Sequence, residues 1–472
     1  MSDQPRATLT ALFHAQQAAF ARDRYPSHGV RVDRLNKMQA LLIDHEDRIA
    51  EAISADFGNR SHHETAIAEV FIVRSAIRHT CKHLKRWMAP RRVDTSRHSW
   101  PGASWINPQP LGVIGIISPW NYPLQLALVP AVEALGAGNR VMIKPSELTP
   151  RFSALLAELV AHYFAADECT VVTGEADLAR EFGQLPFDHL FFTGSTAVGR
   201  LVGAAAAANL TPVTLELGGK SPAIIDLDSD LEDAARKIAA GKLLNAGQTC
   251  VAPDYVLVPA DRVEAFAQAY TRAARQLYPT LANNPDYTSI VNPRHHARLQ
   301  NLVDDARARG ARVLPTHEAE AALAQTRKLT PTLLLDVNDD MSVMQEEIFG
   351  PLLPLRPYQR LQEALDYINA RPRPLALYWF GRNTHHRDEV LRETISGGVT
   401  LNDCLLHLAQ ENLPFGGVGA SGSGAYHGET GFRLFSHNKP VFSQSRFAGA
   451  RLLRPPYGPR TDMLLRWLKK LA

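Results

Sequence analysis

The sequence predicts an α/β protein of two or three domains. Its 472 residues, 45% of them hydrophobic, are enough for a large core and for more than one domain. From residue 111 onward, short apolar segments alternate with segments of helical periodicity, which is typical of βαβ units around a parallel sheet. The net charge of +3 is small for this length and argues against a protein that binds nucleic acid.

The N-terminal part of the chain is expected to be helical as far as residue 88. Apolar residues recur at helical spacing between residues 31 and 57, namely Leu35, Met38, Leu42, Ile49 and Ile53. The next segment, WPGASWINPQP at 100–110, contains proline and glycine breaks and cannot continue a helix. We expect a strand or an extended arm there.

The first alternating series predicts one parallel sheet. Its predicted strands are LGVIGII (111–117), RVMIK (140–144), CTVVT (169–173), DHLFFTG (188–194) and TPVTLEL (211–217). Helical segments lie between them, one reaching residue 137 and another covering 149–164. In such a sheet, ligands bind beyond the carboxyl ends of the strands.

A second series predicts another α/β domain. It starts near SPAIIDL (221–227) and continues with a helix that leads to Cys250, the strand DYVLVP (254–259), and helices at 261–278 and 294–309. The chain closes with a strand candidate at 435–445 and a short amphipathic helix at 461–472. Packing against its own protein is the default interpretation of that helix.

Several segments have the letters of a known motif without its context. GVGASG (417–422) matches GxGxxG, but no strand precedes it and no helix opens from it. GGKS (218–221) is not the end of a P-loop, because Thr214 stands where the first glycine should be. The histidine pairs at 62–63, 295–296 and 385–386 lack the spacing of zinc ligands. The sequence therefore predicts no metal site.

The cysteines and the apolar segments bear on the compartment. The chain has only four cysteines, Cys81, Cys169, Cys250 and Cys404, which are too few and too far apart for a disulfide framework. The N-terminus lacks the continuous apolar segment of a secretory signal, and no stretch approaches the ~20 apolar residues of a membrane span. We expect a cytoplasmic protein without an integral membrane segment.

Two strand ends carry residues suited to a dinucleotide. In FTGSTAVGR (192–200), Gly194 permits a tight turn, and Ser195 with the amides at the helix start can hold an anion. In IKPSE (143–147), Lys144 and Glu147 can hydrogen-bond the hydroxyls of a ribose. The carboxylate favours NAD over NADP because it repels a 2′-phosphate. Helix capping is the simpler interpretation of both segments.

Three polar residues in turns or at strand ends could do chemistry. Asn121 in PWNYP (119–123) is a rigid amide donor suited to an oxyanion hole, although asparagine is also ordinary in a proline-rich turn. Glu216 lies in the apolar segment LELGGKSP (215–222), where burial raises the pKa of a carboxyl and favours a general base. Cys250 in NAGQTCVAPDY (245–255) is either a small buried apolar residue or a nucleophile.

These motifs occur in the order found in the aldehyde dehydrogenase superfamily, which the sequence resembles over essentially its whole length. The shared segments are PWNYP, IKPSE, FTGSTAVG, LELGGKSP, GQTC, EEIFGP (346–351) and PFGG (414–417). NAGQTCVAPDY and the short N-terminus are similar to the class 3 branch of the family. The segments NPDYTSI (284–290) and LTPVTLELGGKSPAI (210–224) are similar to bacterial coniferyl aldehyde dehydrogenases.

The resemblance implies a fold and a domain organisation. A Rossmann-like, parallel-sheet NAD-binding domain would cover 1–98 and 111–215, and a second α/β domain, the catalytic one, would cover 216–434. A small β oligomerisation arm would comprise 99–110 and 435–445. Class 3-like proteins are usually dimers, so a homodimer is expected, and the tail at 446–472 would cap the partner's substrate entrance.

The resemblance also implies roles for individual residues. Cys250 would be the nucleophile, Asn121 with the Cys250 amide would stabilise the oxyanion, and Glu216 would activate water. The implied cofactor contacts are Trp120, Lys144, Glu147, Gly194, Ser195, Gly199, Glu347 and Phe349. Tyr122 and Leu126 would line the substrate tunnel, together with residues near 404–412.

The implied reaction is the oxidation of an aldehyde to its carboxylic acid through a thioester, with NAD as cofactor and NADP as the alternative. Aromatic and apolar walls suit an aromatic aldehyde such as coniferaldehyde, and a medium- or long-chain aliphatic aldehyde is the alternative. Two alternatives come from other classes. One is a catalytically silent, NAD-binding structural protein, and the other is a thiol hydrolase that pairs Cys250 with a histidine.

Overall fold

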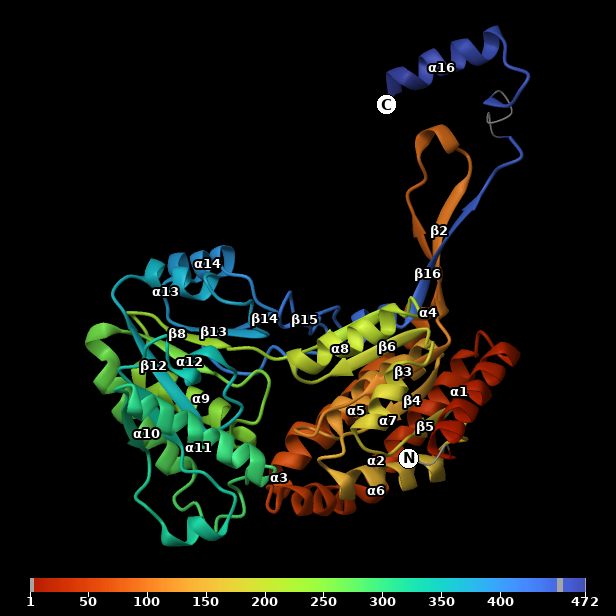
Figure 1. Ribbon diagram of the computed structural model, residues 1–472. Helices are drawn as coiled ribbons and strands as arrows, with labels where there is room; N and C mark the ends of the chain where they lie inside the picture. The colour runs from red at the N-terminus through yellow and green to blue at the C-terminus, as the bar shows by residue number, and fades with distance from the viewer. Residues whose placement is uncertain (1–3, 448–452, 472) are drawn as a thin grey trace.

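The computed structural model describes residues 4–447 and 453–471, and it confirms the predicted α/β architecture. Within these residues the strands form a 6-stranded, a 7-stranded and a 3-stranded sheet. Figure 1 shows the two larger sheets side by side with their helices, and the small sheet projecting away from the body.

The first sheet has the order β15-β7-β6-β3-β4-β5. Its strands are β3 (Val113–Ile117), β4 (Arg140–Lys144), β5 (Cys169–Val171), β6 (His189–Thr193), β7 (Val213–Glu216) and β15 (Gly422–Ser423). All neighbours pair in parallel except β15, which is antiparallel to β7. Every residue of β3, β4 and β6 is buried, as expected for strands covered on both faces. The five strands predicted between residues 111 and 217 are therefore confirmed.

One helix of this half, α5 (Gln125–Ala137), is buried along its whole length. It packs against β3 and β4 on one side and against α2 and α4 on the other, which explains why it is apolar all round. The other helical elements of this half are α1 (Gln4–Arg22), α2 (His28–Phe57), α3 (His62–Thr65), the π-helix η1 (Ala66–Val70), α4 (Phe71–Met88), α6 (Pro150–Tyr163), α7 (Ala176–Gly183), α8 (Thr196–Ala207) and α15 (Gly428–Leu434). The predicted N-terminal helical layer is confirmed, and α1 extends it toward the N-terminus.

The second sheet has the order β10-β11-β12-β9-β8-β13-β14, and only β10 runs antiparallel to its neighbour. Its strands are β8 (Pro222–Ile225), β9 (Tyr255–Pro259), β10 (Arg312–Pro315), β11 (Thr332–Leu335), β12 (Leu352–Tyr358), β13 (Ala376–Phe380) and β14 (Gly398–Leu401). The helical elements of this half are α9 (Leu231–Leu243), η3 (Leu244–Gly247), η4 (Ala260–Arg262), α10 (Val263–Leu277), α11 (Pro293–Ala308), η5 (Ala321–Gln325), α12 (Ser342–Gln345), α13 (Leu361–Asn369) and α14 (Thr384–Glu393). This sheet confirms the predicted second α/β unit.

The small sheet combines segments from distant parts of the chain. Its central strand β2 (Ala103–Pro110) pairs antiparallel with β1 (Arg91–Val93) and with β16 (Ser436–Ser443). The short helix η2 (Arg97–Ser99) lies between β1 and β2. Figure 1 shows these strands projecting from the body, with α16 (Pro459–Leu471) beyond their far end. The strands expected near 100–110 and 435–445 are thus present.

The chain returns to the first sheet before it enters the arm. β15 pairs with β7, and α15 packs against α4 and α5. Residues 422–434, which the predicted limit at residue 434 places in the catalytic domain, therefore lie with the first sheet. A strand of two residues is too short to give a hydrophobic period, so the sequence offered no signal for this return. The domain limits themselves remain predictions.

In the part of the chain that the structure describes, no helix has the length and apolar character needed to cross a membrane.

Candidate active site

Two adjoining cavities lie at the carboxyl ends of strands of the first sheet, and the smaller one reaches Cys250. The larger has a volume of about 800 Å³ and the smaller about 230 Å³. They share the lining residues Pro119, Trp120, Thr193, Gly194, Ser195, His295 and Arg298. One extended ligand can therefore occupy both, at the edge of the sheet where parallel strands bind ligands.

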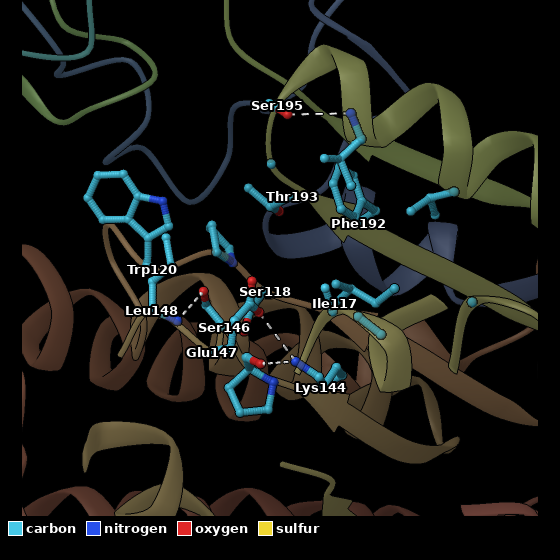
Figure 2. Close-up of a pocket in the computed structure, with 18 of the residues that line it drawn as sticks. Ile117, Ser118, Trp120, Lys144, Ser146, Glu147, Leu148, Phe192, Thr193 and Ser195 are labelled. Carbon is cyan, nitrogen blue, oxygen red and sulfur yellow. Dashed lines mark hydrogen bonds and ion pairs between the residues drawn. The ribbon is translucent and has the colours of Figure 1, made fainter. Parts of the chain in front are cut away.

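The larger cavity is lined by an ion pair at the end of β4, which Figure 2 shows beside Ser146 and Trp120. Nζ of the buried Lys144 donates to the carbonyl oxygen of Pro145 at 2.8 Å and lies 3.6 Å from Oε2 of Glu147. Burial lowers the pKa of Lys144, and the charge of Glu147 partly offsets that effect. The pair presents one donor and one acceptor side by side, which suits neighbouring hydroxyls.

The N-terminus of α8 lies at the same cavity, because Gly194 and Ser195 line it. The hydroxyl of Ser195 accepts a hydrogen bond from the Val198 amide at 3.4 Å, so its contact in this structure is helix capping. Gly199 lines neither cavity. A Cβ at Gly199 would lie 2.6 Å from Cδ2 of Leu217, so this glycine allows α8 to pack closely on the chain beyond β7.

The smaller cavity brings together Cys250, Glu216 and Asn121, which come from three separate segments. Leu126, Glu347 and Phe349 also line it. The ring of Trp120 lies 5.4 Å from that of Phe349, between centroids, at the boundary of the two cavities. A thiol, a carboxyl and an amide donor thus face one small space.

Cys250 follows a turn with an unusual backbone. Asn245 and Ala246 both have a φ of 51°, a left-handed conformation that side chains other than glycine rarely adopt. Gly247 has a φ of 76°, and a Cβ there would lie 2.3 Å from the carbonyl oxygen of Gly350. Gly247 therefore allows a close approach of the turn to Gly350, which is next to Phe349.

Glu216 is isolated at the end of β7. It is buried, and neither carboxyl oxygen has a hydrogen-bond partner among the described residues. Burial alone raises the pKa of Glu216 well above its ordinary value, because the charged form loses its hydration. The predicted burial of this carboxyl is confirmed.

Cys250 is partly exposed, and its pKa is raised to about 12, first by burial and then by the charges of Glu347 and Glu216. The backbone amides of Cys250 and Val251 act in the opposite direction by stabilising the thiolate. Glu347 also has a raised pKa, about 8, caused by burial and by Asp254. A positive charge placed in this cavity would favour the ionised form of all three groups.

Asn121 is held at both ends. Its side-chain Nδ2 donates to the carbonyl oxygen of Gln248 at 3.2 Å, which uses one of its two amide hydrogens. The backbone carbonyl oxygen of Asn121 accepts hydrogen bonds from NH1 of Arg60 at 3.1 Å and from Nδ2 of Asn245 at 3.0 Å. The second amide hydrogen is thus positioned next to the turn that carries Cys250.

The structure does not bring every predicted residue to a cavity wall. Tyr122 lines neither cavity, and its hydroxyl lies 2.7 Å from Oγ1 of Thr249 instead. The region 404–412 is also absent from both walls. The substrate roles predicted for them remain predictions, and Leu126 is the predicted tunnel residue that does line the smaller cavity.

Among the wall residues that the sequence did not predict, two are ionisable and line both cavities. His295 and Arg298 lie in the first turns of α11, and they line both cavities. Nδ1 of His295 lies 2.9 Å from Oδ1 of Asn292, and among the described contacts none joins this ring to Cys250. Burial, followed by Arg298 and Arg294, lowers the pKa of His295, so the ring is neutral near pH 7. The N-cap Asn292 followed by proline marked a helix start in the sequence, but nothing there indicated which cavity it faces.

The aldehyde dehydrogenase family model matches residues 2–441, and the chain therefore belongs to this family. It is an enzyme of the aldehyde dehydrogenase type, as the sequence motifs predicted.

Individual relatives agree with this classification. The chain is 52% identical over 464 residues to a probable coniferyl aldehyde dehydrogenase of Pseudomonas aeruginosa. The alignment covers 98% of this chain and 97% of the relative. It is 48% identical over 440 residues to a coniferyl aldehyde dehydrogenase of a Pseudomonas species, covering 92% and 91%. The structure of a substrate-bound Staphylococcus aureus AldH is similar with a TM-score of 0.92 and 38% identity, covering 97% of this chain and 99% of that one.

Proposed function

We propose that this enzyme oxidises an aromatic aldehyde such as coniferaldehyde to its carboxylic acid, in this case ferulate. The observation that carries the proposal is the convergence of Cys250, Glu216 and Asn121 on one small cavity that opens into a larger one. The relatives named as coniferyl aldehyde dehydrogenases, at 48–52% identity, support the substrate class.

The residues of the larger cavity fit a nicotinamide dinucleotide. Its volume of about 800 Å³, the Lys144–Glu147 pair and the N-terminus of α8 suit a ribose and a pyrophosphate. Trp120 and Phe349 frame the passage to the smaller cavity. There, Oε1 of Glu347 has no partner among the described residues and is free to bind a second ribose.

NAD, when bound there, accepts the hydride that the aldehyde loses. The Cys250 thiolate attacks the aldehyde carbon, and the Asn121 amide with the Cys250 backbone N–H stabilises the oxyanion that forms. Loss of the hydride leaves a thioester on Cys250. Glu216 then removes a proton from water, which attacks the thioester and releases the acid and the thiol. A carboxyl without competing hydrogen bonds, such as Glu216, suits this role.

Cofactor preference and assembly extend the same proposal. Glu147 favours NAD, because a carboxylate at this position would repel the 2′-phosphate of NADP, although NADP use is compatible with the family.

We propose a homodimer that assembles through the arm formed by β1, β2 and β16. The few, widely spaced cysteines fit a cytoplasmic enzyme.

The decisive experiment is NADH formation by the purified protein without CoA. The panel contains coniferaldehyde, cinnamaldehyde, benzaldehyde, hexanal, decanal and succinic semialdehyde, with Cys250→Ala as the inactive control. We expect coniferaldehyde to have the highest kcat/KM. A preference for hexanal or decanal would replace the aromatic substrate with an aliphatic one.

Two results would reject the chemistry itself. NAD binding without turnover of any aldehyde would indicate the silent, structural alternative. Ester hydrolysis without hydride transfer would indicate a thiol hydrolase.

A further inference from the structure

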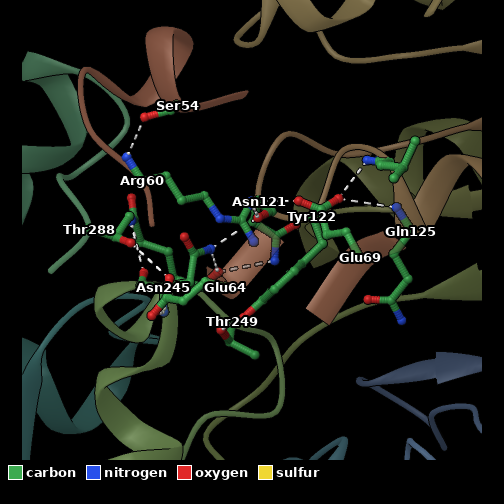
Figure 3. Close-up of polar contacts among 12 residues, drawn as sticks. Ser54, Arg60, Glu64, Glu69, Asn121, Tyr122, Gln125, Asn245, Thr249 and Thr288 are labelled. Carbon is green, nitrogen blue, oxygen red and sulfur yellow. Dashed lines mark hydrogen bonds and ion pairs between the residues drawn. The ribbon is translucent and has the colours of Figure 1, made fainter. Parts of the chain in front are cut away.

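We propose that Arg60 is a positioning residue, which fixes the backbone of Asn121 and thereby the oxyanion-stabilising amide relative to Cys250. The inference rests on the proposed function for its kinetic readout. It is carried by a buried polar network that joins the N-terminal helices to both reacting segments, shown in Figure 3.

The centre of the network is an ion pair between Arg60 and Glu69. Both side chains are 0% exposed, and NH1 of Arg60 lies 2.7 Å from Oε1 of Glu69. The same NH1 donates to the carbonyl oxygen of Asn121 at 3.1 Å. One nitrogen of Arg60 thus links a helical carboxylate to the backbone of the predicted oxyanion donor.

Glu69 fixes the other side of the same loop. It lies in the π-helix η1, an irregularity that is often found at functional sites. Its Oε2 accepts from the backbone amides of Leu124 at 2.7 Å and Gln125 at 3.1 Å, where α5 begins. The loop 121–125 is therefore held at its start by Arg60 and at its end by Glu69.

Asn245 connects this loop to the turn before Cys250. Its Nδ2 donates both to the carbonyl oxygen of Asn121 at 3.0 Å and to that of Gln248 at 3.1 Å. Its backbone amide donates to Glu64, whose carboxylate also accepts from Thr288 at 2.8 Å. Arg60 and Asn245 therefore share one acceptor, and a shift of either is transmitted to the other.

The hydrogen bonding of Arg60 argues against a purely stabilising role. Nε and NH2 of Arg60 have no hydrogen-bond partner among the described residues. The guanidinium lies over the rings of Phe57 and Tyr122, at 5.3 and 4.9 Å from their centroids. A buried ion pair with unsatisfied donors is weak evidence for stability, because apolar residues of similar size often serve stability as well. Positioning of Asn121 explains why a charged guanidinium is buried at this place.

The test is a double-mutant cycle on kcat/KM with Arg60→Lys and Asn121→Ala. Lysine keeps the positive charge but is shorter, so it cannot bridge Glu69 and Asn121 in the same way. We expect Arg60→Lys to lower kcat/KM by about 10- to 100-fold and to leave the Kd of NAD unchanged. If Arg60 acts through Asn121, adding Arg60→Lys to Asn121→Ala causes little further loss. A full, multiplicative loss in the double variant would overturn the inference.

Arg34→Lys is the matched control. Arg34 is also a buried arginine, and its Nε lies 3.1 Å from Oε1 of Glu168, away from both cavities. Its effect on kcat/KM should be small and should multiply with that of Asn121→Ala. If Arg60→Lys does not fold, the pair Arg60→Met with Glu69→Gln, which removes both charges of the ion pair, takes its place in the cycle.

A second readout does not depend on turnover. Alkylation of Cys250 by iodoacetamide, followed by peptide mass spectrometry, reports on the turn at 245–250. We expect faster alkylation in Arg60→Lys, because the loosened turn exposes the sulfur, and an unchanged rate in Arg34→Lys. Equal rates in all three proteins would contradict the inference. If the wild-type protein oxidised no aldehyde, the proposed function would fail and this comparison would still decide the role of Arg60.

Discussion

Two opposing requirements meet in the side chain of Glu216. A general base must be ionised to take a proton from water, yet its burial without hydrogen-bond partners raises the pKa well above the ordinary value. The same isolation makes the ionised carboxylate a stronger base. The balance between ionised fraction and basicity therefore makes hydrolysis of the thioester sensitive to pH.

The pH dependence has a defined sign. Because the pKa of Glu216 is raised, its inactive acid form persists at pH values where an ordinary glutamate is ionised, and each pH unit below the pKa lowers the ionised fraction about tenfold. We expect kcat to keep rising with pH above the range in which an ordinary glutamate is already ionised. Steady-state NADH formation at saturating substrate checks this. A flat profile, with deacylation shown to be rate-limiting, would rule out Glu216 as the base.

Substitution of the same residue should separate the two halves of the reaction. Glu216→Gln keeps the size of the side chain but cannot accept the proton of water. We expect a burst of about one NADH per subunit, followed by a steady-state rate lowered about 10²- to 10⁴-fold. Rapid mixing with absorbance detection measures both phases. Glu158→Gln, which changes an exposed carboxyl that lines neither cavity, should keep normal steady-state kcat.

Residue type and local sequence were sufficient to select the three groups that face the smaller cavity. Cys250, Glu216 and Asn121 each stood out because a reactive or polar group occurred in a tight turn or at an apolar strand end. Arg60 and His295 gave no such signal, since Arg60 lies in the short loop between α2 and α3 and His295 in the first turn of α11, where charged residues are common. Their positions depend on contacts between segments far apart in the chain, which periodicity does not report.

At the scale of elements, the turn η3 and the segment around Gly350 form one packed unit, because Gly247 closely approaches the carbonyl oxygen of Gly350. Strand and helix periodicity located most elements of the first sheet, but the strands β10 to β14 were not located individually. β10, β11 and β14 have only four residues each, and β12 contains two prolines, which argue against a strand, so a single-sequence pattern is weak there. The contact between Gly247 and Gly350 likewise required the fold, because it joins residues from two different connections.

Gly247→Ala tests this unit. The added Cβ would meet the Gly350 carbonyl oxygen at 2.3 Å, and the φ of 76° is itself unfavourable for alanine. We expect a loss of about 1–3 kcal/mol in the free energy of unfolding, together with a large drop in kcat, because the turn carries Cys250. Gly310→Ala is the matched control, since its φ is 99° but no atom lies within 4 Å of the added Cβ. Equal behaviour of the two variants would show that the contact with Gly350 is unimportant.

At the scale of the whole molecule, the arm and α16 extend away from the two cavities. α16 exposes Met463, Leu465 and Trp467 beyond the far end of the arm, as Figure 1 shows for the helix. Exposed apolar side chains on a projecting element are typical of a surface that another chain covers. The sequence predicted both arm segments, and the family resemblance placed them in one arm, but the antiparallel register of β2 with β16 required the fold.

Removal of residues 446–472 is expected to weaken the dimer and to change the substrate profile. The exposed apolar side chains of α16 would no longer contribute to the proposed interface between subunits. Both cavities are lined by residues that precede the deletion. Light scattering over a concentration series measures the mass, and the aldehyde panel measures the profile. If the mass of the dimer and the substrate profile both stayed unchanged, the tail would have no role in dimerisation or in substrate selection.

The pairing of β2 with β16 also sets a sequence of events during synthesis. β2 is made early, and one of its edges pairs with β1, but the partner of its other edge lies near the end of the chain. Until residues 436–443 leave the ribosome, β2 carries an open edge, which is a template for wrong pairing between nascent chains. All strands of both larger sheets, β15 included, precede β16 in the chain, so these sheets can assemble before that moment. The arm is therefore the last sheet to close, and a protein interrupted shortly before residue 436 should be the form most prone to aggregate.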